Sequence, residues 1–131
     1  MENIIDYLSP NNERNNFSFK KKFPFHKRCY EAERIKFKFP GRLPIICERA
    51  NKTIPELDKR KYLVPSDLTL GQFMYVIRNR MNLPPEIGLY LFVGEQFAIP
   101  SNTSMISCVY DTHRDEDGFL YINYSGENTF G

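Results

Sequence analysis

Few side chains in this sequence have the type and spacing that catalysis requires. The two histidines are His26 and His113, and Cys29 follows His26 by three positions. Residues three apart can face each other on a helix, so a Cys–His nucleophilic pair is conceivable. Nothing in the sequence marks a third group that would orient the histidine. We therefore expect no catalytic residue in this chain and no enzymatic activity.

The patterns that bind metals and phosphates are equally weak. Cys29, Cys47 and Cys108 are far apart and form no Cys-x-x-Cys pair, so they indicate reduced thiols. Cys47 lies within a predicted strand and is expected in the core. The acidic run 115–117 lacks the alternating ligands and closing glutamate of a calcium loop, and is predicted to be a solvated hairpin turn. The seven glycines are scattered and form no phosphate loop. No metal and no cofactor are expected.

Positive charge is concentrated in one segment, although the formal net charge is only +2. Residues 20–42 contain nine lysines and arginines, opposed only by Glu31 and Glu33. Phenylalanines interleave with these lysines, a pattern that can stack bases while contacting phosphates. The spacing of Phe25 and Phe39 fits helix packing better, and the whole-chain charge is far below that of typical nucleic-acid-binding domains. Nucleic acid is therefore the less favoured alternative and is not an expected partner.

Length and composition indicate one cytosolic domain. A chain of 131 residues with 41% hydrophobic and 26% charged residues can form one modest apolar core. No apolar run approaches the roughly 20 residues that a membrane-spanning helix needs. The first residues lack a basic region followed by an apolar one, so no secretory signal is expected. Residues 1–16 are predicted to be a flexible N-terminal extension, because 11–16 are polar.

Two helices are predicted ahead of the first strand. Residues 17–22 form the first, and Pro24 begins the second, because a missing N–H costs nothing in the first turn. Pro40 and Gly41 end it. Its apolar stripe near the 3.6-residue period comprises Phe25, Cys29, Ala32, Ile35 and Phe39.

Another helix is predicted to begin at Thr69, because Thr69 and Gln72 have the spacing of a capping box. A weaker helix is predicted over 104–113. The buried stripe of the stronger helix would comprise Leu70, Phe73, Val76, Ile77 and Met81.

Four strands complete the prediction. They cover residues 42–49, 61–64, 89–93 and 119–124. Two strands, a helix and two further strands are the order of an α+β, β-grasp sheet packed on one helix. The second strand is expected at an accessible edge. The predicted domain covers 17–124, and 125–131 is predicted to be a flexible C-terminal tail.

Five ordered segments resemble the autophagy-related ubiquitin-like modifiers, the family of GABARAP and the yeast autophagy-related protein eight. They are 24–28 (PFHKR), 33–35 (ERI), 44–48 (PIICE), 58–65 (DKRKYLVP) and 117–121 (DGFLY). The similarity runs from about Phe17 to Gly131, with small length differences near 51–53 and 94–102. It implies a ubiquitin-like β-grasp domain with two additional N-terminal helices.

The resemblance also implies conjugation through Gly131. In the family, the matching glycine is activated by an ATP-dependent enzyme, passed between cysteines as a thioester, and joined to phosphatidylethanolamine. A glycine suits this step because it has no Cβ to obstruct a catalytic cysteine. The implied partners are activating and conjugating enzymes, a deconjugating cysteine protease and phosphatidylethanolamine membranes. The implied location is the cytoplasm and, after lipidation, the autophagosome membrane.

The resemblance further implies binding of autophagy receptors and adaptors that carry an aromatic-x-x-aliphatic motif. The motif would add a strand to the second strand of the sheet. The aromatic pocket would comprise Glu31, Ile35, Pro44, Ile46, Lys61, Leu63 and Phe119. The aliphatic pocket would comprise Tyr62, Val64, Pro65, Leu68, Phe73 and Val76. Arg42, with Lys61, matches positions that pair with acids flanking the motif.

One alternative uses the same pockets differently. A non-conjugated peptide-binding trafficking adaptor would bind motif peptides without using Gly131. The N-terminal extension lacks an aromatic-x-x-aliphatic motif, because Pro10 stands three places after Tyr7. We therefore do not expect the extension to occlude the pockets.

Overall fold

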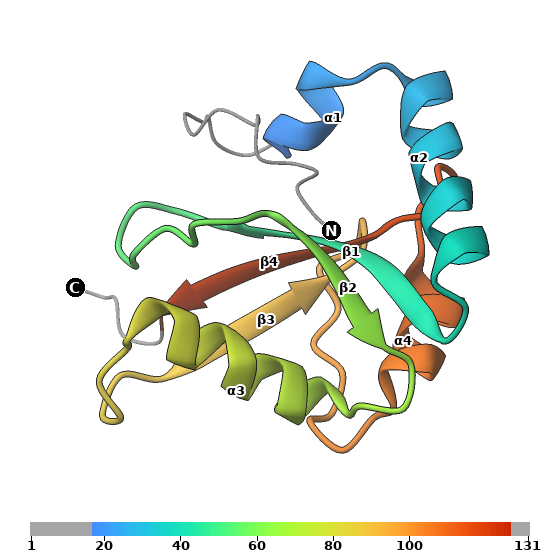
Figure 1. The fold of residues 1–131 in the computed structure, drawn as a ribbon. Coiled ribbons are helices and arrows are strands. Elements are labelled where there is room, and N and C mark those ends of the chain that lie inside the picture. The colour runs from blue at the N-terminus through green and yellow to red at the C-terminus, as the bar shows by residue number, and fades with distance from the viewer. Residues whose placement is uncertain (1–16, 127–131) are drawn as a thin grey trace.

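The computed structural model describes residues 17–126, which form four helices and four strands in the predicted order (Figure 1). The elements are α1 (Ser18–Lys22), α2 (Phe25–Lys38), β1 (Arg42–Arg49), β2 (Lys61–Pro65), α3 (Leu70–Met81), β3 (Leu89–Val93), α4 (Ile106–His113) and β4 (Leu120–Gly126). The predicted extension 1–16 and Gly131 lie outside the described residues. Within the described range, no helix combines the length and the apolar character that crossing a membrane demands.

The four strands form one mixed sheet in the order β2-β1-β4-β3. The central strands β1 and β4 run parallel, whereas β2 pairs with β1 and β3 pairs with β4 in the antiparallel sense. This arrangement confirms the predicted α+β, ubiquitin-like β-grasp fold. It also places β2 at an edge of the sheet, as predicted.

Helices cover both faces of the sheet (Figure 1). The main core lies on the α3 face, where Phe73 and Ile77 pack against strand residues such as Ile45 and the predicted core residue Cys47. A second core lies on the opposite face, under α1 and α2. Its buried members are Phe19, Ala32, Ile35, Ile46, Phe119 and Tyr121. Alternation along β1 assigns Ile45 and Ile46 to opposite cores.

The structure shows where α3 begins and which of its residues are buried. The Thr69 hydroxyl accepts from the Gln72 N–H at 3.1 Å, and the Gln72 side chain accepts from the Thr69 N–H at 2.8 Å. This confirms the predicted capping box. The prediction that Val76 is buried was wrong, since its side chain is 40% exposed. The buried face is centred on Leu70, Phe73 and Ile77, and Val76 lies at its border.

The α2 stripe is narrower than predicted. Only Ala32 and Ile35 are buried, whereas Phe25 is 48% exposed. Phe25 is the first residue of the helix, and the buried residues lie in its later turns.

Strand β4 is longer than predicted. Ser125 and Gly126 pair with Tyr90 and Leu89 of β3, so the prediction of a flexible tail was wrong for these two residues. The apolar alternation ends at Tyr124, but backbone pairing with β3 does not need apolar side chains. Residues 127–131 of the predicted tail lie outside the described residues.

In the acidic turn before β4, Glu116 is exposed as predicted, but the prediction of a solvated side chain was wrong for Asp117. Asp117 is 2% exposed. Its carboxylate accepts from Arg28 Nε at 2.8 Å, from the Tyr121 hydroxyl at 2.6 Å and from the Phe119 N–H at 2.8 Å. The turn therefore anchors α2 to the sheet.

Candidate functional site

The outer edge of β2 presents main-chain groups that the sheet does not pair. The Cys47 N–H donates to the Arg60 carbonyl at 2.8 Å, and the register then places Lys61 opposite Ile46. Opposed pairs alternate between bonded and non-bonded in an antiparallel ladder. The N–H and C=O groups of Lys61 and Leu63 therefore point away from β1, toward the open edge. Such an edge is a template for an added strand.

Side chains of β2 alternate between the two cores. Leu63 packs against the second core under α2, whereas Tyr62 and Val64 pack against the main core under α3. The edge therefore has one apolar face on each side of the sheet. The two predicted pockets fall on these two faces.

The structure brings the predicted aromatic-pocket residues together at the junction of α2 and β2. Ile35, Ile46 and Phe119 are fully buried, and Leu63 packs on them while half-buried. Pro44 is buried opposite Leu63 in the strand register. Leu63 is thus the apolar member of this set that retains accessible surface, and the others support it from below.

An ion-pair network joins α2 to β2 at the same junction. The Lys61 ammonium donates to Glu31 Oε2 at 2.6 Å, and Arg34 donates to both Glu31 oxygens at 3.0 and 2.9 Å. Burial acts to raise the pKa of Glu31, but the hydrogen bonds from Arg34 and Lys61 outweigh it and lower the pKa. The Lys61 side chain is only 3% exposed. The Lys61 ammonium therefore forms an ion pair with Glu31 and is shielded from solvent.

Arg42 lies over the open edge of β2. Its Nη1 donates to the Leu63 carbonyl at 3.1 Å, and Arg42 is exposed. A carbonyl has two lone pairs, so this contact leaves room for one further donor. Arg42 is therefore a cation placed at the edge itself.

The predicted aliphatic-pocket residues surround the other side of β2. Phe73 and Val64 are buried and form a floor, and the Tyr62 ring meets the Phe73 ring edge-on at 5.9 Å between centroids. Leu68 packs partly buried against the same core, and Pro65 is half-buried at the end of the strand. Val76, wrongly predicted as core, is an exposed apolar side chain on α3, the helix that also carries Phe73.

Comparison with known proteins identifies the family. The family model described as "Autophagy protein Atg8 ubiquitin like" matches residues 27–131. This chain belongs to the Atg8 family. It is 59% identical over 115 residues to Autophagy-related protein 8 of Vanderwaltozyma polyspora, covering 87% of this chain and 96% of that protein. It is 56% identical to Autophagy-related protein 8 of Saccharomyces cerevisiae strain YJM789, over 87% of this chain and 97% of the relative.

A solved structure of another Atg8 has the same fold. The crystal structure of Trypanosoma brucei ATG8 superposes with a TM-score of 0.82 and 42% sequence identity, covering 89% of this chain and 100% of that one. The chain is therefore a ubiquitin-like autophagy protein of the Atg8 family.

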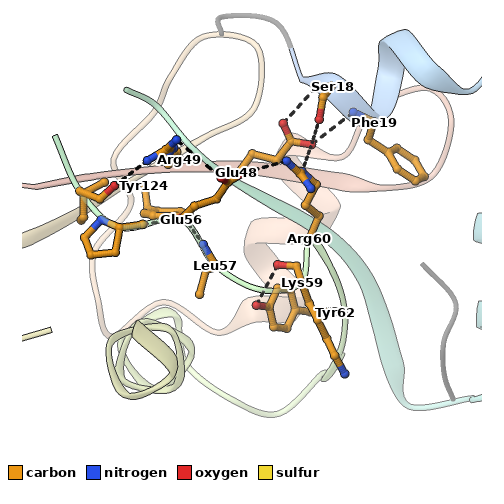
Figure 2. A network of polar contacts seen from close by, with 12 residues as sticks. Ser18, Phe19, Glu48, Arg49, Glu56, Leu57, Lys59, Arg60, Tyr62 and Tyr124 are labelled. Atoms are coloured by element: carbon orange, nitrogen blue, oxygen red, sulfur yellow. Dashed lines mark hydrogen bonds and ion pairs between the residues drawn. The ribbon is translucent and has the colours of Figure 1, made fainter. Parts of the chain in front are cut away.

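In this Atg8-family chain, a polar network holds the connection that leads into β2 (Figure 2). The Glu48 carboxylate accepts from the Ser18 N–H at 2.9 Å and from the Phe19 N–H at 3.2 Å, which caps the start of α1. Arg60 lies 3.4 Å from Glu48 and 2.9 Å from Glu56. Burial raises the pKa of Glu48, against the opposing effect of these donors. The sequence alone does not predict this network, because its partners are distant along the chain.

The conceivable Cys29–His26 pair lacks an activated thiol. Burial, with the nearby carboxylate of Asp117, raises the pKa of Cys29, whereas a nucleophilic cysteine needs a lowered pKa. Among residues 17–126, no group of three or more His, Cys, Asp or Glu side chains could hold a metal ion.

Proposed function

We propose that this Atg8-family chain is a modifier that recruits autophagy receptors and adaptors during autophagosome formation. It is joined through Gly131 to phosphatidylethanolamine by activating and conjugating enzymes, and a deconjugating cysteine protease releases it. Catalysis belongs to these partners. The protein acts in the cytoplasm and, once lipidated, on the autophagosome membrane. The observation that carries the receptor-binding part is the unpaired outer edge of β2 between two apolar faces.

The geometry of an extended peptide explains why two faces are needed. Successive side chains of a strand point to opposite faces, so residues i and i+3 lie on opposite sides and about 10 Å apart along the strand. An aromatic-x-x-aliphatic peptide added to β2 places its aromatic residue on the α2 face, against Leu63. Its aliphatic residue then reaches the α3 face, beside Tyr62 and Val76. The outward main-chain groups of Lys61 and Leu63 bind the peptide backbone.

The charges divide into two roles. Arg42 is exposed at the edge and binds acidic residues that flank the motif. Lys61 is committed to Glu31, so its role is to position α2 beside β2. This division assigns the flanking contact mainly to Arg42.

Truncating Leu63 tests the proposed receptor groove, which is the open edge of β2 with its two predicted pockets. We expect Leu63→Ala to weaken binding of an aromatic-x-x-aliphatic peptide by about 1–3 kcal/mol, because a central anchor contact is lost. Isothermal titration calorimetry measures the affinity. Ile99→Ala is the matched control, because Ile99 is an exposed aliphatic residue outside both pockets. Equal affinity of wild type and Leu63→Ala would discard the pocket assignment.

A further inference from the structure

A cleft of about 870 Å³ lies on the α1 side of the sheet, over β4 rather than β2. One wall is formed by α1 and the start of α2, including Lys21 and Phe25. The other wall is formed by residues 94–97 and 112–116, and Tyr121 and Asn123 of β4 line it from the sheet. None of the predicted motif-contact residues between 17 and 126 lines this cleft. Its volume is within the range of ordinary binding sites.

Phe97 is held in an unfavourable conformation beside this cleft. Its φ is +54°, a region that bulky residues rarely adopt. The Phe97 N–H donates to the Gly94 carbonyl at 3.2 Å, and Val93 and Ala98 exchange two backbone hydrogen bonds at 2.8 and 2.9 Å. These hydrogen bonds fix the backbone of the loop, and the Phe97 side chain is 61% exposed. The loop therefore presents an aromatic side chain to solvent rather than burying it in either core.

The charges at the cleft are partly satisfied within the chain. Lys20 pairs with Asp115 at 2.7 Å, and Arg28 pairs with Asp117 at 2.8 Å. Lys21 is exposed and forms no ion pair with any described residue. It lies in a segment, residues 17–28, that contains five lysines and arginines and no acidic residue.

The opposite wall of the cleft carries negative charge that is unpaired among the described residues. Glu95 and Glu116 are exposed and have no ion-pair partner between residues 17 and 126, and Arg114 lies 3.9 Å from Asp111. The α1 and α2 wall therefore attracts a carboxylate, and the 94–97 wall repels one. This asymmetry fixes the side on which an acidic ligand lies.

We propose that this cleft binds an acidic segment of a partner protein through one large apolar side chain. That side chain lies between the walls that carry Phe25 and Phe97, and a neighbouring carboxylate lies against Lys21. Exposed aromatic side chains bordered by charged residues are the chemistry that dominates binding energy at protein interfaces. The site is separate from the β2 edge, so one molecule can bind two partners at once.

The probe is a five-residue peptide with blocked ends, with phenylalanine at its centre and aspartate or glutamate elsewhere. It has no aliphatic residue three places after its aromatic residue, so it cannot fill both faces of β2. Chemical shifts of the ¹⁵N-labelled full chain are followed during titration. We expect the largest changes at Lys21, Phe97 and Thr112, with an affinity that falls as salt is added.

Two variants test the contacts. Phe97→Asn removes the ring but keeps a residue that tolerates positive φ, and it should weaken probe binding about tenfold. Lys21→Glu should weaken it by a similar factor, whereas Lys52→Glu, an equal charge change at an exposed site outside the cleft, should leave it unchanged. Leu63→Ala should also leave it unchanged, which separates this site from the proposed receptor groove.

Three results would overturn the proposal. The first is the absence of chemical-shift changes at millimolar peptide. The second is equal probe affinity for wild type and Phe97→Asn. The third is a set of shift changes centred on β2 and lost in Leu63→Ala.

Discussion

The two faces of the sheet are held by different kinds of interaction. The α3 face has eighteen buried side chains in one apolar cluster, whereas the α1 and α2 face has six among the described residues. The smaller face is supplemented by buried or half-buried polar links. They are the Arg28–Asp117 pair, the Lys61–Glu31 pair and the Glu48 cap of α1. Apolar burial is largely indifferent to pH and salt, but polar links are not.

The candidate receptor groove lies where these two faces meet. Strand β2 contributes Tyr62 and Val64 to the large core and Leu63 to the small one. The aliphatic side of the groove therefore has a firm apolar floor, and the aromatic side depends on how α2 is positioned. The difference predicts that damage to the α3 face lowers stability most, and damage to the α2 face changes the groove more selectively.

Phe73→Ala should have the largest effect on stability. The side chain is 1% exposed in the main core, and truncating a buried phenylalanine costs about 3–5 kcal/mol. Urea unfolding followed by circular dichroism measures the loss. Val76→Ala on the same helix is the control and should change the unfolding free energy by less than about 0.5 kcal/mol. Similar losses in the two variants would contradict the assignment of the core face.

Arg28→Ala should affect the α2 face. It leaves the fully buried Asp117 carboxylate without its cation, and breaking a buried pair costs about 3 kcal/mol or more. We expect the low end, because Tyr121 and Phe119 still donate to Asp117. Hydrogen exchange should accelerate in α2 more than in α3. Lys27→Ala, its exposed neighbour, is the control; uniform acceleration across both helices would show that the faces do not open separately.

The smallest effect is the pH dependence of the Glu31 network. Because the folded-state pKa of Glu31 lies below the ordinary 4.5, its stabilisation is present above pH 4.5 and is lost as pH falls through the lowered value. Glu31→Gln should therefore destabilise the protein at pH 7 and much less at pH 3. Unfolding free energies of the two proteins at both pH values measure this. A difference that does not shrink at pH 3 would rule out the ionised carboxylate as the stabilising group.

Local signals in the sequence predicted most of the fold. The isoleucine and leucine content of residues 42–49 predicted β1, and the Thr69–Gln72 capping box predicted the start of α3. These features depend on neighbouring residues, so they can be recognised without the tertiary structure. The order of strands around one helix then indicated the β-grasp sheet and the edge position of β2.

Features that depend on distant partners could not be predicted in this way. Asp117 is an acidic residue in a turn, and the cation that pairs with it is Arg28, 89 positions earlier. Lys61 was expected to contact the ligand, but it pairs with Glu31, which lies 30 positions earlier in the sequence. The resemblance to the family supplied the members of both pockets, and the structure shows which of them retain accessible surface.

Conjugation through Gly131 is tested most directly by reconstitution. The full chain is mixed with Atg8-family activating and conjugating enzymes, ATP and phosphatidylethanolamine liposomes, and its intact mass is measured. We predict a phosphatidylethanolamine adduct on the wild type and none on Gly131→Ala. If a control Atg8 reacts in the same mixture and this chain does not, the chain is not a substrate of this conjugation system, and the non-conjugated adaptor becomes the better description.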